Sequence, residues 1–367
     1  MIAPPLDTRI PHLAALTGLR GVAAWMVVLY HARLLLTDWL PGGVTAMAGM
    51  GYLAVDVFFL LSGFVMWLNY GPRLRRDGLA GAPRFWWRRI ARIWPLHALV
   101  LAGMVAFALV LLAAGRSTAG YPFGELPLHL LLVQNWGFTP DLSWNHPAWS
   151  ISAELGAYLL FPLVAVSVRW EDMRPAMLIA AMIGAAFALH AVFALAGEPG
   201  LGGRIARLGL VRCVLEFAIG VMCANLWLSW RAGWTGALAS ALAGGVLAAL
   251  GIAVGWPETA FVPLAFAALL LALALDGGPI ARALGSAPLR WLGDASYATY
   301  LIHFPLFILV KLVGVDERLQ LGPVGFVVYC AVLLALSGAL HRWWEKPAQR
   351  WLNRRAPRPA APRVPAE

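Results

Sequence analysis

The sequence predicts an all-α fold, a polytopic transmembrane bundle of about ten spans. Of the 367 residues, 61% are apolar, and the mean hydropathy is +0.73. A water-soluble domain of this length has too little interior to enclose so much apolar surface. Apolar runs of about 20 residues recur along the chain, and each could form a helix that crosses the ~30 Å hydrocarbon core of a bilayer.

The apolar runs define the individual spans. We place them at residues 14–36, 52–70, 93–115, 148–168, 176–196, 207–229, 234–254, 259–275, 291–313 and 322–343. Segment 126–136 is apolar but too short to cross alone, so it is interpreted as re-entrant or interfacial. No small-residue cleavage site follows the first run, so we expect the first span to stay in the mature protein.

Basic residues flank the predicted spans unevenly. Residues 71–92 contain seven arginines, and the chain from residue 342 onward contains seven basic residues. With ten spans, both segments lie on the same side as the amino terminus, and the positive-inside rule places both termini in the cytoplasm. Topology therefore explains the net charge of +10, and we expect no nucleic-acid partner. The chain should be a multi-pass protein of a bacterial inner membrane.

The chain divides into two predicted parts. Residues 1–345 form one transmembrane domain, and residues 346–367 form a basic, Pro- and Ala-rich cytoplasmic tail that we expect to be disordered. The three cysteines lie in apolar runs without a Cys-x-x-Cys pair, which indicates buried packing rather than disulfides or a metal site. We expect no metal. The chain also has no GxSxG, Walker or HExxH motif, which disfavours simple hydrolases, ATPases and metalloproteases.

Two ionisable side chains lie in the first span. Arg20 and His31 are eleven residues apart, which is about three helical turns and ~16 Å along the axis, so both side chains face the same side. This pattern predicts a polar stripe from the inner surface toward the outer leaflet. Arg20 as an interfacial anchor and His31 as an ordinary bundle histidine remain alternatives. Histidine is the side chain best suited to proton transfer near neutral pH.

Glu154 and His31 are expected at a similar depth. Glu154 is six residues inside the outer end of its span, and His31 is five residues inside the outer end of the first span. The two side chains could therefore meet in one cavity, where the carboxylate would orient the imidazole and stabilise its cation. The alternative is that Glu154 bonds to a neighbouring helix.

Arg89 and Arg92 share one face of a predicted helix, because they are three residues apart. A fixed pair of guanidinium groups can bind phosphate. Ordinary inside-positive anchoring is the alternative, although seven arginines in one loop exceed what orientation requires.

Polar residues in two further spans are candidate cavity-lining groups. Asp56 and Ser62 lie in the second span. Asp56, near the outer end, could alternatively be interfacial, and the Ser62–Gly63 pair alternatively indicates close helix packing. The ninth span carries a polar ladder whose alternative role is interhelical hydrogen bonding. Its members are Ser296, Tyr297, Tyr300 and His303. Glu345 lies at the inner boundary and is expected to pair with an arginine.

These segments together resemble the acyltransferase-3 family of integral membrane O-acyltransferases, over nearly the whole chain. The family's Arg-x10-His signature is similar to Arg20 and His31, and its Arg-x-x-Arg to Arg89 and Arg92. Three further segments match in family order: FFLLSGF (58–64), WSISAE (149–154) and SYATYLIH (296–303).

The resemblance implies transfer of an acyl group, most commonly acetyl, from cytoplasmic acyl-CoA to a hydroxyl of a glycan, a lipid-linked sugar or a macrolide-like acceptor. Arg20, Arg89 and Arg92 would hold the phosphates of CoA, and His31, oriented by Glu154, would act as general base. Some members carry an extracytoplasmic hydrolase-like domain, which these 367 residues do not contain; whether a separate extracytoplasmic partner completes the transfer stays open.

Three other functional interpretations remain open. A covalent acyl-enzyme would use His31 or Ser152. Buried Arg, His and Glu also suit a proton-coupled transporter of glycans or drugs. The third is a passive scaffold for envelope assembly, in which alanine at residues 31 and 154 would leave the phenotype intact.

Overall fold

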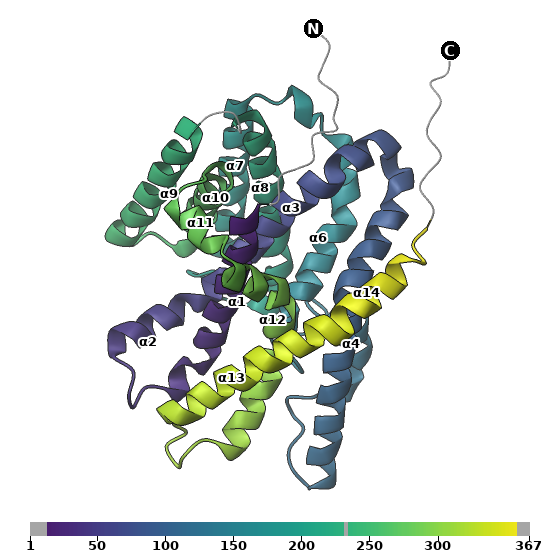
Figure 1. Cartoon of the computed structure of the whole chain (residues 1–367), viewed down its shortest axis with the longest axis vertical. Coiled ribbons are helices and arrows are strands. Elements are labelled where there is room, and N and C mark those ends of the chain that lie inside the picture. The colour runs from purple at the N-terminus through teal and green to yellow at the C-terminus, as the bar shows by residue number, and fades with distance from the viewer. Residues whose placement is uncertain (1–12, 231–233, 358–367) are drawn as a thin grey trace.

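The computed structural model describes residues 13–230 and 234–357, and in this part of the chain every regular element is helical (Figure 1). The long helices are α1 (Ala14–Ala32), α3 (Ala54–Asp77), α4 (Ala82–Ala113), α6 (Ala148–Ser167), α7 (Pro175–Leu195), α8 (Ile205–Trp230), α9 (Trp234–Val254), α10 (Glu258–Leu275), α12 (Ala287–Val313) and α13 (Pro323–Leu340). The short helices are α2 (Gly42–Gly49), α5 (Leu126–Leu130), α11 (Pro279–Leu284) and α14 (Lys346–Asn353). Single 3₁₀ turns cover Arg33–Leu35, Met50–Leu53, Gly78–Gly81, Phe123–Glu125 and Trp170–Asp172.

The long helices correspond to the spans expected from hydropathy. Eight segments of the described chain are long and apolar enough to cross a membrane, and one of them, Gly42–Ala113, contains both α3 and α4. Together with the 26-residue α8, these segments supply a helix for each of the ten predicted spans. The prediction of an all-α, polytopic membrane bundle is therefore confirmed, and the protein is a multi-pass membrane protein.

Glycines allow the central helices to approach closely. Helix α3 packs on α8, and a Cβ atom at Gly63 would overlap the carbonyl oxygen of Phe217. Reciprocally, a Cβ atom at Gly220 would overlap the carbonyl oxygen of Leu60. Small residues are the usual means of close helix contact in membranes. Gly63 therefore serves the close packing that was one interpretation of the Ser62–Gly63 pair, while Ser62 faces a cavity described below.

The segment between α4 and α6 contains no helix long enough to cross a membrane in the described part of the chain. Its only α-helix in the structure is the five-residue α5, in agreement with the re-entrant or interfacial interpretation of residues 126–136. Polar side chains hold the segment in place: His97 Nε2 lies 2.8 Å from the His129 carbonyl oxygen, and Asn145 donates to the Leu301 carbonyl at 2.9 Å. The segment is thus fixed against the middle of α4 and of α12.

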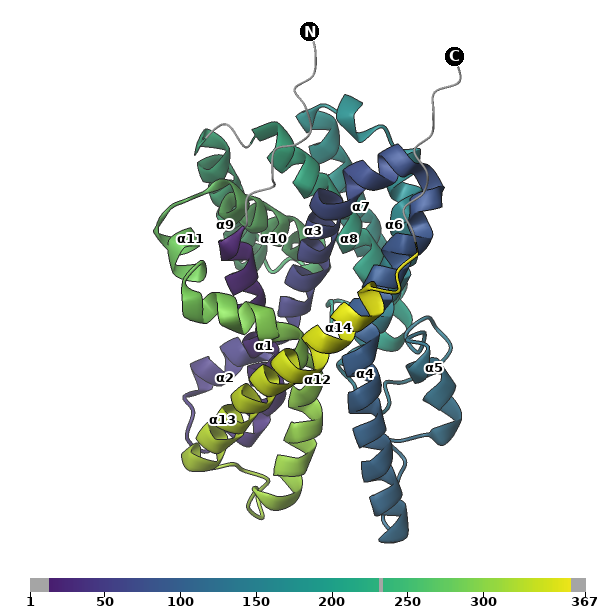
Figure 2. The same cartoon turned by 45° about the vertical axis from the view of Figure 1, so that its right-hand side comes forward.

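The chain after α13 differs from the disordered tail expected for residues 346–367. One π-helical turn, His341–Glu345, joins α13 to α14, and the two helices form a single long rod in Figures 1 and 2. Contacts with α4 explain the order: the Trp87 indole donates to the Leu352 carbonyl at 2.8 Å, and the Trp344 indole donates to the Pro95 carbonyl at 3.0 Å. Residues 346–353 are therefore helical, and residues 358–367 lie outside the described part.

Candidate active site

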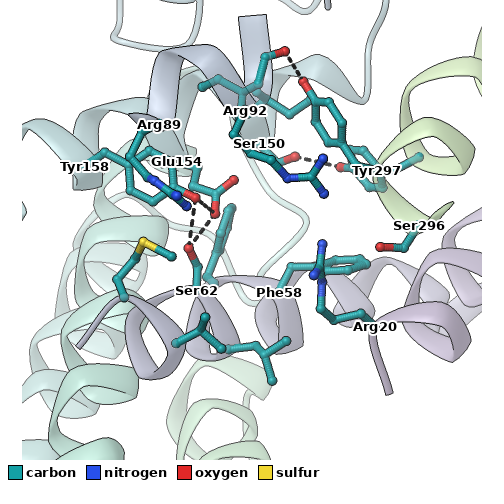
Figure 3. A pocket seen from close by; sticks show the side chains of 17 residues that line it. Arg20, Phe58, Ser62, Arg89, Arg92, Ser150, Glu154, Tyr158, Ser296 and Tyr297 are labelled. Carbon is teal, nitrogen blue, oxygen red and sulfur yellow. Dashed lines mark hydrogen bonds between the residues drawn. The ribbon is translucent and has the colours of Figure 1, made fainter. Parts of the chain in front are cut away.

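Helices α1, α3, α4, α6 and α12 enclose a cavity of about 190 Å³ (Figure 3), called the central cavity below. Eight of the eleven residues proposed from sequence as site residues line it. They are Arg20, Ser62, Arg89, Arg92, Glu154, Ser296, Tyr297 and Tyr300. Three do not line it: His31, Asp56 and His303. Apolar side chains of α3, including Phe58 and Phe59, complete the wall. Most of the site residues proposed from sequence therefore lie around one cavity.

Three arginines from two helices give the central cavity its positive charge. The guanidinium groups of Arg20 and Arg92 point into the same space from opposite walls (Figure 3). Arg92 forms an ion pair with Glu345, and Arg89 donates to the Tyr70 hydroxyl at 2.7 Å. Arg20 has no hydrogen bond or ion pair to any described residue, so it is the arginine most available to an anionic ligand. The pairing of Glu345 with an arginine is confirmed.

Glu154 belongs to this cavity and not to a dyad with His31. Its carboxylate accepts hydrogen bonds from the hydroxyls of Ser62 and Tyr158, both at 2.5 Å (Figure 3). The structure contains no Glu154–His31 bond among the described residues, so the expected carboxylate–imidazole pair is not formed. Two side chains at equal depth in different helices meet only if the helices are turned so that the side chains face each other. Glu154 instead places a negative charge among the arginines.

His31 pairs with a second imidazole from α12. Its Nδ1 lies 3.0 Å from the Val27 carbonyl oxygen and 3.2 Å from Nε2 of His303. His303 Nδ1 lies 2.7 Å from the Tyr300 carbonyl oxygen. The pattern fits one set of tautomers, in which each Nδ1 carries the proton and donates it to a carbonyl. Nε2 of His31 is then the free basic nitrogen of the pair.

Tyr300 separates the central cavity from the histidine pair. Its side chain lines the cavity, and its hydroxyl lies 2.7 Å from the Ser150 hydroxyl. Its ring centroid is 5.8 Å from that of His303. A ligand that fills the cavity therefore ends one side chain short of the two histidines.

Asp56 has a structural partner in place of the cavity expected for it. Its carboxylate is fully buried and accepts two hydrogen bonds from Arg212 in α8, at 2.7 and 2.6 Å. Glu216, one turn further along α8, lies 4.0 Å from the same guanidinium. The sequence analysis missed Arg212 and Glu216, although an Arg and a Glu four residues apart inside an apolar span were a visible signal.

The other members of the α12 polar ladder bond to backbone. The Ser296 hydroxyl donates to the Gly293 carbonyl at 2.8 Å, and the Tyr297 hydroxyl donates to the Ile93 carbonyl. The Tyr297 ring lies under the Arg92 guanidinium at 5.3 Å. Both residues line the cavity, and Tyr297 also joins α12 to α4, whereas the Ser296 bond stays within α12.

Two histidines, His129 and His146, lie in the segment between α4 and α6. The His146 ring stacks on Phe304 with centroids 4.9 Å apart, and Phe304 also contacts the His31 ring at 5.3 Å. His129 Nε2 lies 2.9 Å from the Ser143 hydroxyl. Burial, followed by the nearby His97 and His146, lowers the pKa of His129 to about 4. His129 is therefore neutral at pH 7 and helps to hold the segment between α4 and α6 in place.

Comparison with known proteins points to the same family that the sequence motifs resemble. The model of the acyltransferase-3 family, described as an acyltransferase domain, matches residues 13–342. Acyltransferase MdmB of Streptomyces mycarofaciens is 33% identical over 401 aligned positions, which cover 98% of this chain and 96% of that protein. No solved structure matches the chain.

Two further relatives are longer proteins. The putative peptidoglycan O-acetyltransferase YrhL of Bacillus subtilis is 26% identical, over 81% of this chain and 49% of its own length. O-acetyltransferase OatA of Staphylococcus aureus is 24% identical, over 92% of this chain and 57% of its own length. The chain thus spans about half the length of these two relatives. Because the family model covers nearly all of it and one relative matches end to end, this protein belongs to the acyltransferase-3 family of membrane acyltransferases.

Proposed function

We propose that the protein is an acyl-CoA-dependent O-acyltransferase of a bacterial inner membrane. It moves an acyl group, acetyl in the first instance, from cytoplasmic acyl-CoA to a hydroxyl of a glycan, lipid-linked sugar or macrolide-like acceptor. The observation that carries the proposal is a cationic cavity that ends, at Tyr300, beside the His31–His303 pair. Membership of an acyltransferase family favours this function over a proton-coupled transporter.

The charge of the central cavity suits an anionic donor. Arg20 has no partner among the described residues, and Arg89 bonds only to a neutral tyrosine hydroxyl. Guanidinium groups bind phosphate through paired, charge-assisted hydrogen bonds. Arg20 and Arg89 therefore attract the phosphates of acyl-CoA and guide its thioester arm along the cavity toward Tyr300, and Arg92, held by its ion pair with Glu345, lines the same path. The arm must pass Tyr300 for the thioester carbonyl to reach His31.

His31 is the proposed general base. Its Nε2 takes the proton of the acceptor hydroxyl while the hydroxyl oxygen attacks the thioester carbonyl carbon. A carbon–oxygen bond forms, the carbon–sulfur bond breaks, and the departing thiolate recovers the proton from His31. The products are the acyl ester and CoA thiol, so His31 ends each cycle neutral. His303 holds the His31 ring in place, and Glu154 acts in the cavity on the donor side.

The test uses purified protein in liposomes with labelled acetyl-CoA and hydroxyl acceptors. We expect label to become covalently bound to an acceptor, and His31→Ala to lower the rate by about 10²- to 10⁴-fold, the usual contribution of general base catalysis. His190→Ala is the matched control, because His190 bonds to Thr259 away from the cavity. Equal rates for His31→Ala and wild type would refute the mechanism. Movement of label without a new covalent bond would instead identify a transporter.

The acceptor side of the proposal needs a separate measurement. Mass spectrometry of envelope glycans and secreted metabolites, with and without the gene, would show which hydroxyl carries the acyl group. If transfer occurs in cells but not with the purified protein and the same acceptor, a separate extracytoplasmic partner completes the reaction.

A further inference from the structure

A second cavity of about 360 Å³ lies between α3 and α4, at the end where the two helices are joined. Figure 2 shows this join as the dark-blue arch on the upper right. We call it the arch cavity, and the predicted topology places it on the cytoplasmic side. Its walls combine aromatic and charged side chains. They are Tyr70, Arg73, Leu74, Arg76, Asp77, Gly81, Arg84, Phe85 and Arg88.

The arch cavity contains cations that the protein leaves without partners. Arg84 and Arg88 are partly buried, yet neither forms a hydrogen bond or ion pair with a described residue, and Nε of Arg88 is buried and unpaired. Arg73, at the rim of the cavity, also has no hydrogen bond or ion pair with a described residue. The only carboxylate that lines the described cavity is Asp77, and it pairs with Arg76 at 3.1 Å. Burying a cation without a partner is unfavourable.

Two arginines elsewhere in the bundle, by contrast, have carboxylate partners. Arg212 is neutralised by Asp56, and Arg92 is neutralised by Glu345. The arch cavity thus offers three unpaired guanidinium groups around one space, which is the arrangement expected of a phosphate site.

The arch cavity lies next to the central cavity. Both lie along α3 and α4, and Tyr70, which lines the arch cavity, accepts a hydrogen bond at 2.7 Å from Arg89, which lines the central one. Ser62 and Arg73 are eleven residues apart in α3, which corresponds to ~16 Å along the helix axis. A ligand could therefore place phosphates in the arch cavity and a long thin arm in the central cavity, a shape that acyl-CoA has.

We propose that the arch cavity holds the 3′-phosphoadenosine end of the acyl-CoA donor. Arg84, Arg88 and Arg73 bind its 3′-phosphate, and the walls formed by Tyr70 and Phe85 lie against the adenine. Arg89 and Arg20 are then left for the pyrophosphate and the start of the arm. This assignment rests on the proposed function and deepens it, because it names the part of the donor that each cavity recognises. The phosphate of an anionic lipid is the competing source of the same chemistry.

A comparison of two donors tests the assignment. Acetyl-CoA carries the nucleotide, and acetyl-pantetheine carries the same thioester without it. For Arg84→Gln/Arg88→Gln, we expect kcat/KM with acetyl-CoA to fall about 10- to 100-fold relative to wild type, since each lost charged hydrogen bond weakens binding by about tenfold. The ratio of variant to wild type with acetyl-pantetheine should stay near one. Equal losses with both donors, or no loss with either, would overturn the assignment.

Matched variants control for charge and folding. Arg169→Ala/Arg282→Ala removes two exposed arginines outside both cavities, and we expect it to match wild type with both donors. The single variant Arg88→Gln repeats the test if the double variant is poorly folded, with an expected loss of about tenfold for acetyl-CoA.

A binding measurement separates this inference from the proposed function. Adenosine 3′,5′-bisphosphate should raise the Tm of the wild-type protein in neutral-lipid nanodiscs and should not raise that of the double variant. This result supports the arch site even if no acyl transfer is seen with either donor, in which case only the proposed function fails. No rise in the wild-type Tm would overturn the inference. A rise that depends on Arg84 and Arg88 and appears with anionic lipid, but not with the nucleotide, would assign the cavity to a lipid headgroup.

Discussion

Nε2 of His303 lies 3.2 Å from Nδ1 of His31, although the two residues are 272 positions apart in the chain. Close packing of α1 on α12 brings them together. The imidazole proposed as base is therefore held by a second imidazole and by the Val27 carbonyl, without a carboxylate. His303 in turn is held by the Tyr300 carbonyl, so a backbone carbonyl of α1 orients one ring and a backbone carbonyl of α12 orients the other.

The first prediction concerns His303 as a positioning residue. His303→Ala should lower kcat by about 10- to 100-fold and leave the KM for acyl-CoA within about twofold, because the donor phosphates bind elsewhere. His303→Gln should recover part of the rate, since its carbonyl oxygen can still accept a hydrogen bond from His31. Steady-state kinetics with varied acyl-CoA measure both constants. A rise in KM without a change in kcat would show that His303 acts on the donor instead.

The second prediction separates the observed role of Glu154 from the dyad expected from sequence. Glu154→Gln removes the charge that accepts hydrogen bonds from Ser62 and Tyr158. We expect a loss of about 1–3 kcal/mol of stability, typical of hydrogen bonds to a charged acceptor. The pH dependence of kcat should keep the wild-type midpoint, because Glu154 does not touch His31. A pH–rate profile checks this, and a shifted midpoint would restore the dyad.

The third prediction concerns the buried pair of Asp56 and Arg212. Asp56→Ala alone should destabilise the protein by about 3–5 kcal/mol, because it leaves a buried guanidinium without its main partner. Asp56→Ala combined with Arg212→Met should be less destabilising than the sum of the two single variants. Chemical unfolding in detergent gives the four free energies of the cycle. Strict additivity would mean that the two side chains are not energetically coupled.

The fourth prediction tests the contact between α3 and α8. Gly63→Ala should destabilise the bundle by at least about 1–3 kcal/mol, because the added methyl group meets the backbone of Phe217 and must displace α8. Gly103→Ala in α4 is the matched control, since nothing lies within 4 Å of its Cβ position. Thermal unfolding and expression level report the difference. Similar behaviour of the two variants would contradict the packing described here.

Hydropathy and spacing predicted the helices and the depth of each polar residue. Runs of about 20 apolar residues fixed the spans, and the three-turn spacing predicted that Arg20 and His31 face the same side of the first span. These features are local, so a single helix carries the whole signal. The basic loop likewise pointed to Arg89 and Arg92 before any cavity was known.

Lateral contacts between helices could not be predicted in the same way. The depths of Glu154 and His31 suggested a pair, but the rotation and neighbours of each helix decide which side chains meet. Glu154 turned toward Ser62 and Tyr158, and His31 turned toward α12. The ordered helix after residue 345 was missed for a similar reason, because its order comes from tryptophan contacts with a helix about 260 residues away.

The π-helical turn at His341–Glu345 has a practical consequence for work with this protein. A chain shortened at residue 345 would lose the Leu352 carbonyl, which accepts a hydrogen bond from the Trp87 indole. It would also loosen Glu345, the ion-pair partner of Arg92. Weak activity of such a truncation would then be mistaken for a defect in chemistry. An affinity tag or fluorescent reporter is better attached after residue 357, where it leaves this junction and the adjoining arginine undisturbed.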